Sequence, residues 1–172
     1  TAAALSLAGG AILMVIGIMV APMALKAMGT PDDIMDYSVT YMRVYFLGII
    51  PNLIYNMGAG VLRAIGDSKR PLYFLIASCM VNVVLDLLFV LVFRLEVLGA
   101  ALATILSQLI SAVLVTITLM RSVTIYQLSL KDIRFDRPML VKIIQIGLPA
   151  GLQSVLYSVS NLVIQVSINH FG

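Results

Sequence analysis

An acidic residue, Asp86, lies inside the apolar stretch SCMVNVVLDLLFV at residues 78–90. A charged side chain at the centre of a membrane helix costs about 2.5 to 3.5 kcal/mol on insertion scales, so it persists only with a partner or a function. Burial favours the protonated acid, whereas a bound cation favours the carboxylate. Asp86 is therefore a candidate ion-coupling residue, and the alternative is a hydrogen bond to Asn82 inside a packed bundle.

Polar side chains recur at helical spacing around Asp86. Ser78, Asn82 and Asp86 are four residues apart and share one helix face. Three further apolar runs carry comparable stripes, made of Tyr41, Tyr45, Asn52 and Asn56, of Thr104, Ser107, Gln108 and Ser111, and of Gln153, Tyr157, Ser160, Asn161, Gln165 and Asn169. Any single stripe is explained equally well by hydrogen bonds that pack membrane helices together. The four stripes together predict a polar cavity between helices.

The composition indicates the helices that must position these side chains. The 172 residues are 61% hydrophobic and 11% charged, which is typical of a membrane protein and excludes an ordinary soluble domain. Five runs approach the roughly 20 apolar residues that cross a bilayer, namely Thr1–Leu25, Val44–Leu62, Pro71–Phe93, Val97–Met120 and Ile143–Asn169. We expect an all-α bundle of five transmembrane helices. The second helix is expected to begin near Pro31 and thus to extend beyond its apolar part.

Turn residues and charges divide and orient these helices. Gly29 and Gly66 are suited to end helices in left-handed caps, and the short RLE segment at 94–96 predicts an antiparallel hairpin. Eight basic residues lie on one side, at Arg63, Lys69, Arg70, Arg121, Lys131, Arg134, Arg137 and Lys142, against three on the other. The positive-inside tendency therefore predicts that the connections after the second and fourth helices are cytoplasmic.

The polar segment RSVTIYQLSLKDIRFDRPMLVK at 121–142 is the best candidate for a domain boundary. Four closely connected helices precede it, and a helix that starts anew after Pro138 follows it. The chain lacks an initial Met and stops directly after an apolar run, so we expect a piece of a longer protein. The single Cys79 excludes an internal disulfide and a cysteine-based metal site.

Several stretches of the chain closely resemble the multidrug and toxic compound extrusion (MATE) transporters. They are VLRAIGDSKRPLYFLIASCMVNVVLDLLFV, LGAALATILSQ, MGTPDDIMDYSVTYMRVYFLG and IGLPAGLQ, spread over nearly the whole sequence. The resemblance implies two six-helix lobes around a central cleft. Residues 1–120 would be the third to sixth helices of the N-terminal lobe, 121–142 the cytoplasmic linker between lobes, and 143–172 the first helix of the C-terminal lobe.

The resemblance also implies a function and a site. Members of the family export organic cations and amphipathic drugs in antiport with H⁺ or Na⁺ by alternating access. In one branch, the ion site uses an Asn and an Asp one turn apart on the fifth helix, a Thr on the sixth and an Asp on the first. Asn82, Asp86 and Thr104 match the first three. Some relatives carry a Glu in the C-terminal lobe where this chain has Tyr157, which favours coupling through the N-terminal lobe.

The resemblance also implies which ligands the polar stripes would contact. We expect drug-like small molecules to pass a cavity lined by Asn52, Asn56, Gln108, Gln153, Tyr157, Asn161 and Gln165. Phenylalanine and methionine side chains would supply adaptable apolar contacts. The expected protein is a monomeric, multi-pass transporter of the plasma or inner membrane. We expect no enzymatic activity, no cofactor, no metal apart from Na⁺ at Asp86, and no nucleic acid partner, since the net charge of +3 is confined to loops.

Three alternatives stay open. A lipid-linked precursor flippase of the same superfamily would share the two-lobe design, but such flippases hold a pyrophosphate with several basic residues, and no apolar run here contains one. An intramembrane aspartyl protease needs two aspartates that share a proton, whereas Asp86 is the only acid in any apolar run. A purely structural membrane subunit is the third alternative.

Overall fold

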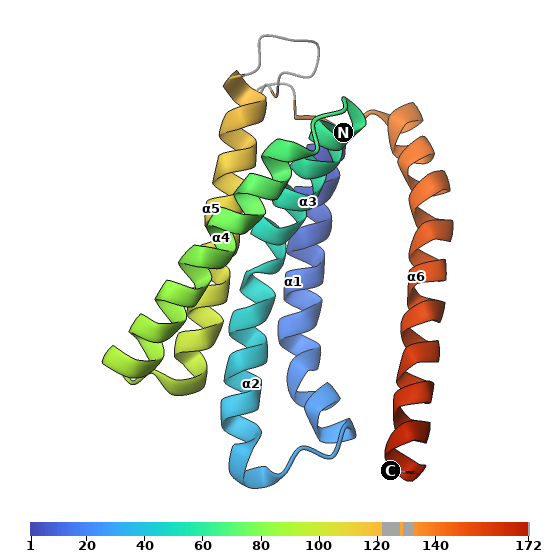
Figure 1. Ribbon diagram of the computed structural model, residues 1–172. Helices are drawn as coiled ribbons and strands as arrows, with labels where there is room; N and C mark the ends of the chain where they lie inside the picture. Colours follow the sequence, from blue (N-terminus) through green and yellow to red (C-terminus); the bar gives the residue numbers. More distant parts are fainter. Residues whose placement is uncertain (122–127, 129–132, 172) are drawn as a thin grey trace. The chain divides into compact units, whose positions relative to one another are not determined.

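The structure is a computed structural model that describes residues 1–121, 128 and 133–171, and the side chains of 162, 163 and 165–171 are left out of the description. All regular structure in these residues is helical, which confirms the all-α prediction (Figure 1). The elements are α1 (Ala2–Ala27), α2 (Asp32–Leu47), α3 (Ile49–Ala64), α4 (Lys69–Leu87), a π-helix η1 (Leu88–Val92), α5 (Glu96–Arg121) and α6 (Arg137–Phe171). Five spans within the described residues are long and apolar enough to cross a membrane, as predicted.

The chain divides into two compact units. One consists of Ala3–Ile133, and the other of Thr1–Ala2 with Arg134–Gly172. The second unit is essentially the helix α6, in which no described side chain is buried. Most of the expected linker, 122–127 and 129–132, lies outside the described residues. The assignment of the units to two transporter lobes stays a prediction.

Helix α6 begins at Arg137, six residues before the predicted start at Ile143. The prediction placed Pro138 before the helix, but a proline is tolerated in the first turn because its missing N–H has no intrahelical partner there. The carboxylate of Asp136 caps this turn by accepting the N–H of Met139 at 2.9 Å. The last residues of the predicted linker are therefore helical.

The predicted second helix forms one membrane-length span, Asp32–Ala64, but it is interrupted at Gly48, where the structure divides it into α2 and α3. Pro51 has no N–H to donate to the carbonyl of Leu47, so the helical ladder is interrupted at this point. The N–H of Gly48 donates to the Tyr45 carbonyl at 3.0 Å, and Asn52 N–H donates to the Gly48 carbonyl at 3.1 Å. The two helices follow each other directly through this buried junction.

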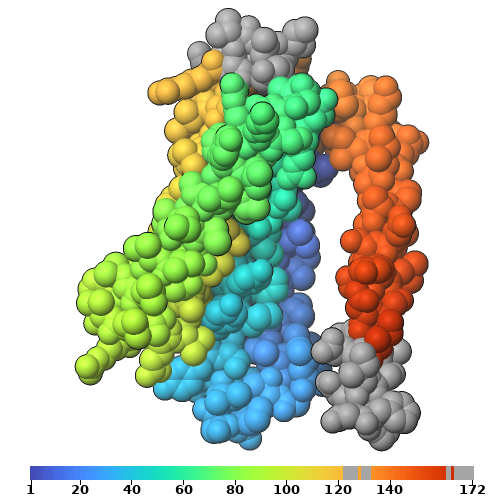
Figure 2. All heavy atoms as spheres, viewed as in Figure 1, coloured from blue at the N-terminus to red at the C-terminus, as the bar shows by residue number. Residues whose placement is uncertain are grey.

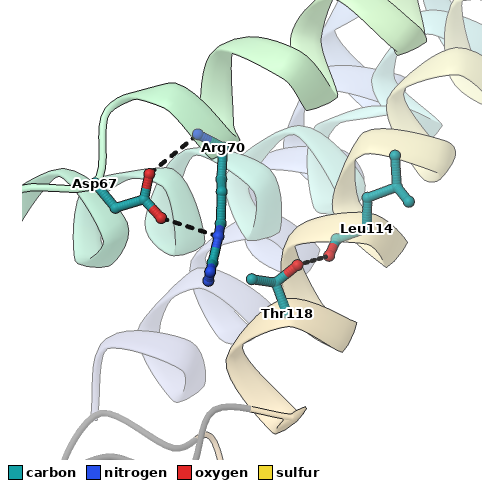
Figure 3. Close-up of polar contacts among 4 residues, drawn as sticks. All are labelled: Asp67, Arg70, Leu114 and Thr118. Atoms are coloured by element: carbon teal, nitrogen blue, oxygen red, sulfur yellow. Dashed lines mark hydrogen bonds and ion pairs between the residues drawn. The ribbon is translucent and has the colours of Figure 1, made fainter.

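The turns at the ends of α1 and α3 confirm the predicted glycine caps. Gly29 and Gly66 adopt φ values of +73° and +88°, in the left-handed region that side chains disfavour. After Gly66, the Asp67 carboxylate accepts the N–H of Arg70 at 3.1 Å and lies 3.2 Å from its guanidinium Nε (Figure 3). This contact satisfies one backbone N–H in the first turn of α4, which starts at Lys69 and holds Pro71 in the same turn.

Helix α5 is the centre of the first unit, since α2, α3 and α4 all pack against it. The hairpin of α4 and α5 is confirmed, and Figure 1 shows these helices side by side. A buried cluster joins α3 to α5 through Tyr55, Ala59, Leu62, Ala112, Val115 and Leu119. Small residues in this cluster allow the helix axes to approach closely. The hydroxyl of Thr118 makes a hydrogen bond within its own helix, donating to the Leu114 carbonyl at 2.8 Å (Figure 3).

The outer face of α4 is apolar, and the space-filling view shows α4 lying across the front of the unit (Figure 2). Met80, Val84 and Leu87 are more than half exposed there, with exposed fractions of 65%, 62% and 55%. A surface of this kind suits contact with lipid or with further apolar helices. The opposite face of α4 carries the polar residues considered below.

Helix α1 packs through its smallest residues. Gly10 and Gly17 are buried, and a Cβ atom at Gly10 would lie 3.2 Å from Ile50. A Cβ atom at Gly17 would overlap the ring of Phe46 on α2. In contrast, a Cβ atom at Gly9 would have no neighbour within 4 Å among the described residues.

We expect Gly17→Ala to lower the stability of the protein and Gly9→Ala, the matched control, to leave it unchanged or raise it. The added methyl at position 17 meets the Phe46 ring, and overpacking of this kind costs about 1–3 kcal/mol. The methyl at position 9 meets open space and improves helix propensity by about 0.5–1 kcal/mol. Thermal unfolding of both variants in detergent measures the difference. Equal melting temperatures would contradict the packing of α1 on α2.

Candidate functional site

A polar cavity of about 460 Å³ lies between α3, α4 and α5. Its size falls within the range of about 300–1,000 Å³ that is typical of small-molecule sites. The lining residues are Asn52, Tyr55, Asn56 and Arg63 from α3, Leu75, Ser78, Cys79 and Asn82 from α4, and Thr104, Ser107, Gln108 and Ser111 from α5. Polar residues from three of the predicted stripes therefore meet at one cavity, whereas Tyr41 and Tyr45 of the stripe that includes Asn52 and Asn56 do not line it. No residue of α1, which has no such stripe, is among them.

Five of the twelve lining side chains are hydrogen-bonded within their own helix. Asn56 donates to both the backbone and side-chain oxygens of Asn52 at 2.9 Å. The hydroxyls of Thr104, Ser107 and Ser111 donate to carbonyls three or four residues earlier in α5, at 2.8 to 2.9 Å. These bonds satisfy the hydroxyl donors while leaving oxygen lone pairs available along the cavity wall.

Two hydrogen bonds connect the three helices. The hydroxyl of Ser78 donates to the Ser107 carbonyl at 2.6 Å and joins α4 to α5. The hydroxyl of Tyr55 donates to the Pro71 carbonyl at 2.9 Å and joins α3 to α4. Both donors belong to buried residues. Ser78 therefore has a packing role in this structure, as one reading of its stripe expected.

The three expected ion-site residues are only partly brought together. Asn82 and Thr104 line the cavity, whereas Asp86 lies one turn farther along α4 and outside the lining. The Asp86 side chain is half-buried, and its Oδ1 is fully covered. Neither this oxygen nor Asn82 Nδ2, also covered, has a hydrogen-bond partner among the described residues. The alternative Asp86–Asn82 hydrogen bond is thus not formed by these atoms.

An unpaired, covered carboxylate oxygen requires a physical explanation. Leaving a buried polar atom without a partner costs about 1–3 kcal/mol, and more for a charged group. Native proteins tolerate few such atoms, and those that persist are found at functional sites or where water or an ion binds. Asp86 Oδ1 can take up a proton or contact a cation. The arrangement therefore suits the binding of H⁺ or Na⁺.

Sequence reasoning missed two features beside this site. The first is η1, the π-helix that begins two residues after Asp86, and Phe93 at its end donates its N–H to the Leu88 carbonyl at 3.0 Å. Segments of π-helix are frequent at functional sites, but the apolar sequence LFVLV carries no marker for one. The second is Arg63, which lines the cavity from the last turn of α3. Its spacing of seven residues from Asn56 puts both on one face and could have identified it.

The remaining predicted cavity residues lie on α6 and are described within that unit alone. Gln153, Tyr157 and Asn161 follow one another at four-residue spacing and are all exposed, Tyr157 by 70%. The side chain of Gln165 lies outside the described residues. Their predicted place along a ligand path remains untested.

Comparison with known proteins identifies the family of the chain. The model of the MatE family matches residues 1–88, which is half of the sequence. The chain belongs to the MatE family. This is a family of transporters rather than enzymes, and with five membrane-length helices the chain is part of a multi-pass membrane protein.

Similar proteins have names that refer to drug resistance. The chain is 33% identical to "Probable multidrug resistance protein YpnP" of Bacillus subtilis, over 91% of this MatE chain and 35% of that protein. It also resembles a "multidrug resistance MATE family transporter of the MOP superfamily" solved in two conformations. The outward-facing structure matches with a TM-score of 0.80 and 27% identity, over 90% of this chain and 34% of that one. The inward-facing structure matches with a TM-score of 0.76 and 28% identity, over 84% and 33%.

The chain thus spans about a third of the length of the relatives that it matches. Its described helices account for one part of the architecture of a MatE protein. The activity of the whole protein is inferred below from the site and from the family.

We expect Ser78→Ala to destabilise the first unit by about 1 kcal/mol, because it removes the hydrogen bond that joins α4 to the Ser107 carbonyl of α5. Ser158→Ala is the control, since Ser158 is exposed and bonds only to Ser154 in its own helix. Thermal unfolding in detergent should show a lower midpoint for Ser78→Ala alone. The packing role of Ser78 would be wrong if the two variants unfolded alike.

Proposed function

We propose that the protein containing this chain is a secondary active multidrug efflux transporter. It exports organic cations or amphipathic drugs in antiport with H⁺ or Na⁺, by alternating access between two lobes. The observation that carries the proposal is the covered and unpaired carboxylate oxygen of Asp86, one helical turn from a polar cavity in a MatE family chain.

Asp86 couples the ion to the substrate through its charge. The empty carboxylate needs water or a cation nearby, since an unpaired charge in the membrane interior is costly. A bound proton or sodium ion neutralises this charge and removes the need for hydration. The protein conformation that best accommodates the neutral site then becomes more populated. Asn82 and Thr104 assist by presenting their polar atoms to the cavity beside Asp86.

The cavity supplies a path for the drug. Asn52, Asn56 and Gln108 offer amide groups along two of its walls, and exchange of hydrogen bonds among such groups tolerates ligands of varied shape. Gln153, Tyr157, Asn161 and Gln165 would add to this path from the first helix of the second lobe. Relatives captured in outward-facing and inward-facing states support a cavity that opens alternately to each side of the membrane.

The distribution of basic residues supports an orientation in the membrane. The α3–α4 turn and the C-terminal end of α5 lie at the same end of the first unit (Figure 1), and this end carries Arg63, Lys69, Arg70 and Arg121. Placing it in the cytoplasm follows the positive-inside tendency. The segment that follows α5 is then the cytoplasmic linker between the lobes.

The alternatives are less well supported. A flippase for a lipid pyrophosphate would need several basic residues in its cavity, and among the described residues Arg63 alone provides one. An aspartyl protease would need a second aspartate beside Asp86, but the apolar runs of the sequence contain no other acid. Undecaprenyl-pyrophosphate binding or peptide cleavage by the full-length protein would reverse this ranking.

We expect Asp86→Asn to abolish ion-driven export, because the amide can neither release a proton nor carry the charge that attracts Na⁺. The measurement is drug uptake into proteoliposomes of the full-length protein under an imposed pH or sodium gradient. Asp33→Asn is the control, since Asp33 is an exposed acid in the first turn of α2. Unchanged transport by Asp86→Asn at every pH would remove Asp86 from the mechanism.

Thr104→Ala distinguishes the two coupling ions. A hard cation such as Na⁺ is held by several oxygen ligands, whereas a proton needs the carboxylate alone. The Thr104 hydroxyl donates its hydrogen to Ala100 and keeps its oxygen available to a cation. If Na⁺ is the coupling ion, Thr104→Ala should raise the sodium concentration for half-maximal transport about tenfold. Sodium dependence identical to that of the wild type would exclude Thr104 as a ligand.

A further inference from the structure

A second cavity, of about 530 Å³, is lined by the C-terminal end of α1, the first half of α2 and the first turn of α5. We call it the outer cavity. Among the described residues, none lines both this cavity and the polar cavity. The α1–α2 connection and the α4–α5 turn lie at the end of the first unit opposite the α3–α4 turn (Figure 1). In the proposed orientation, the outer cavity therefore lies on the side away from the cytoplasm.

The walls of the outer cavity are aliphatic and aromatic. Leu25, Ile34 and Val97 contribute aliphatic side chains from three different helices. Tyr37 and Tyr41 contribute phenol rings from α2. Walls of this kind suit the apolar body of a small molecule, and the volume is in the range of such sites.

The tyrosines of α2 form an aromatic row. Tyr37, Tyr41 and Tyr45 are four residues apart and share one face of the helix. The rings of Tyr41 and Tyr45 are stacked, with their centroids 6.2 Å apart and 20° between the ring planes. The face of a phenol ring attracts a cation that lies within about 6 Å of its centroid. The aromatic wall therefore suits a ligand with positive charge.

Glu96 is the one charged residue among the described residues that line the outer cavity. Within the described part of the chain, its carboxylate has no ion-pair partner. Its backbone has a φ of +48°, in the left-handed region that residues with a Cβ atom rarely adopt. Strained positions of this kind are concentrated at functional sites, where the surrounding structure holds them. An unpaired negative charge is thus kept in the wall of an otherwise apolar and aromatic cavity.

We propose that the outer cavity binds an amphipathic organic cation, with the positive charge beside Glu96 and the apolar body against Tyr37 and Tyr41. The site is separate from the polar cavity and from Asp86, so the inference goes beyond the proposed export function. Only its position on the side away from the cytoplasm rests on that proposal. The carboxylate and the rings both attract the charge, and the aliphatic walls receive the apolar groups. An uncharged molecule of the same shape gains only the apolar contacts, and an inorganic cation gains none of them.

The test measures how well a ligand protects a thiol placed inside the outer cavity. Ser38 lines this cavity, so Ser38→Cys introduces the thiol there. Its alkylation in the full-length protein is followed by mass spectrometry of the peptide that contains position 38. Benzyltrimethylammonium, an aromatic quaternary ammonium ion, should slow the alkylation. Neopentylbenzene, its uncharged carbon analogue, should protect only at higher concentration.

A charge variant and its control, both made in the Ser38→Cys protein, test the role of the carboxylate. Glu96→Gln should raise the concentration of benzyltrimethylammonium for half-protection about fivefold, as expected for an exposed ion pair. Asp36→Asn should leave this concentration unchanged, because Asp36 is an exposed acid on the face of α2 opposite Ile34 and Ser38. Glu96 also lies in the first turn of α5, where an acid favours the helix. Thermal unfolding of each variant therefore separates a loss of stability from a loss of binding.

A second pair of variants tests the aromatic wall. Tyr41→Leu removes the ring and should raise the half-protection concentration of the cation about threefold. Tyr41→Phe keeps the ring and loses only the hydroxyl, so it should protect as the Ser38→Cys protein does. The protection by neopentylbenzene should not respond to Glu96→Gln, because this ligand has no charge.

Any of four results would overturn the inference. Benzyltrimethylammonium could fail to protect, neopentylbenzene could protect equally well, Glu96→Gln could leave the half-protection concentration unchanged, or Tyr41→Leu could behave as Tyr41→Phe does. Ion-driven export is measured separately in proteoliposomes, so each of these results leaves the proposed function standing. Protection without export would instead retain the outer site and contradict the proposed function.

Discussion

Inside the hydrocarbon core of a membrane, a polar atom must find its partner within the protein, because no lipid tail can supply one. The first unit obeys this constraint almost throughout. Serine and threonine hydroxyls donate hydrogen bonds to carbonyls of their own helix, and two side-chain hydrogen bonds link neighbouring helices. The covered side-chain atoms that depart from it among the described residues are Asn82 Nδ2, Asp86 Oδ1 and Gln108 Oε1. All three belong to the cavity wall or lie one turn from it.

The unpaired polar atoms are concentrated at the cavity, and this distinguishes them from the polar atoms that join one helix to another. If the polar stripes served only to join helices, their atoms would be paired across the interfaces, as Ser78 is with Ser107. Asn82 and Gln108 come instead from facing helices and leave polar atoms without partners at the same cavity. Glycine and alanine make this possible, because close packing of α3 on α5 at Ala59 and Ala112 holds the helices together without using the polar side chains.

Run length and turn chemistry were sufficient to predict the helices, and spacing was sufficient to predict which polar residues of α3, α4 and α5 face each other. The break at Gly48 was missed because Pro51 was treated as one more apolar residue of a continuous run. The π-helix could not be predicted, since the apolar sequence of η1 also suits an α-helix. Helical phase placed Asp86 in line with Asn82 and Ser78, but the cavity ends before the turn of α4 that carries Asp86. Residue spacing gives the face of a helix and does not reveal how far along the helix a cavity extends.

The two ends of α4 are held differently. The first half of α4 is tied to its neighbours by the Tyr55 and Ser78 hydrogen bonds. Beyond Ser78, no described side chain of α4 makes a hydrogen bond to another helix, and Phe89 of η1 meets α5 by close packing on Gly99. Apolar contacts are less directional than hydrogen bonds, so they permit small displacements at lower cost. The half of α4 that carries Asp86 is therefore less firmly tied to its neighbours than the first half, and it continues directly into the π-helical segment η1.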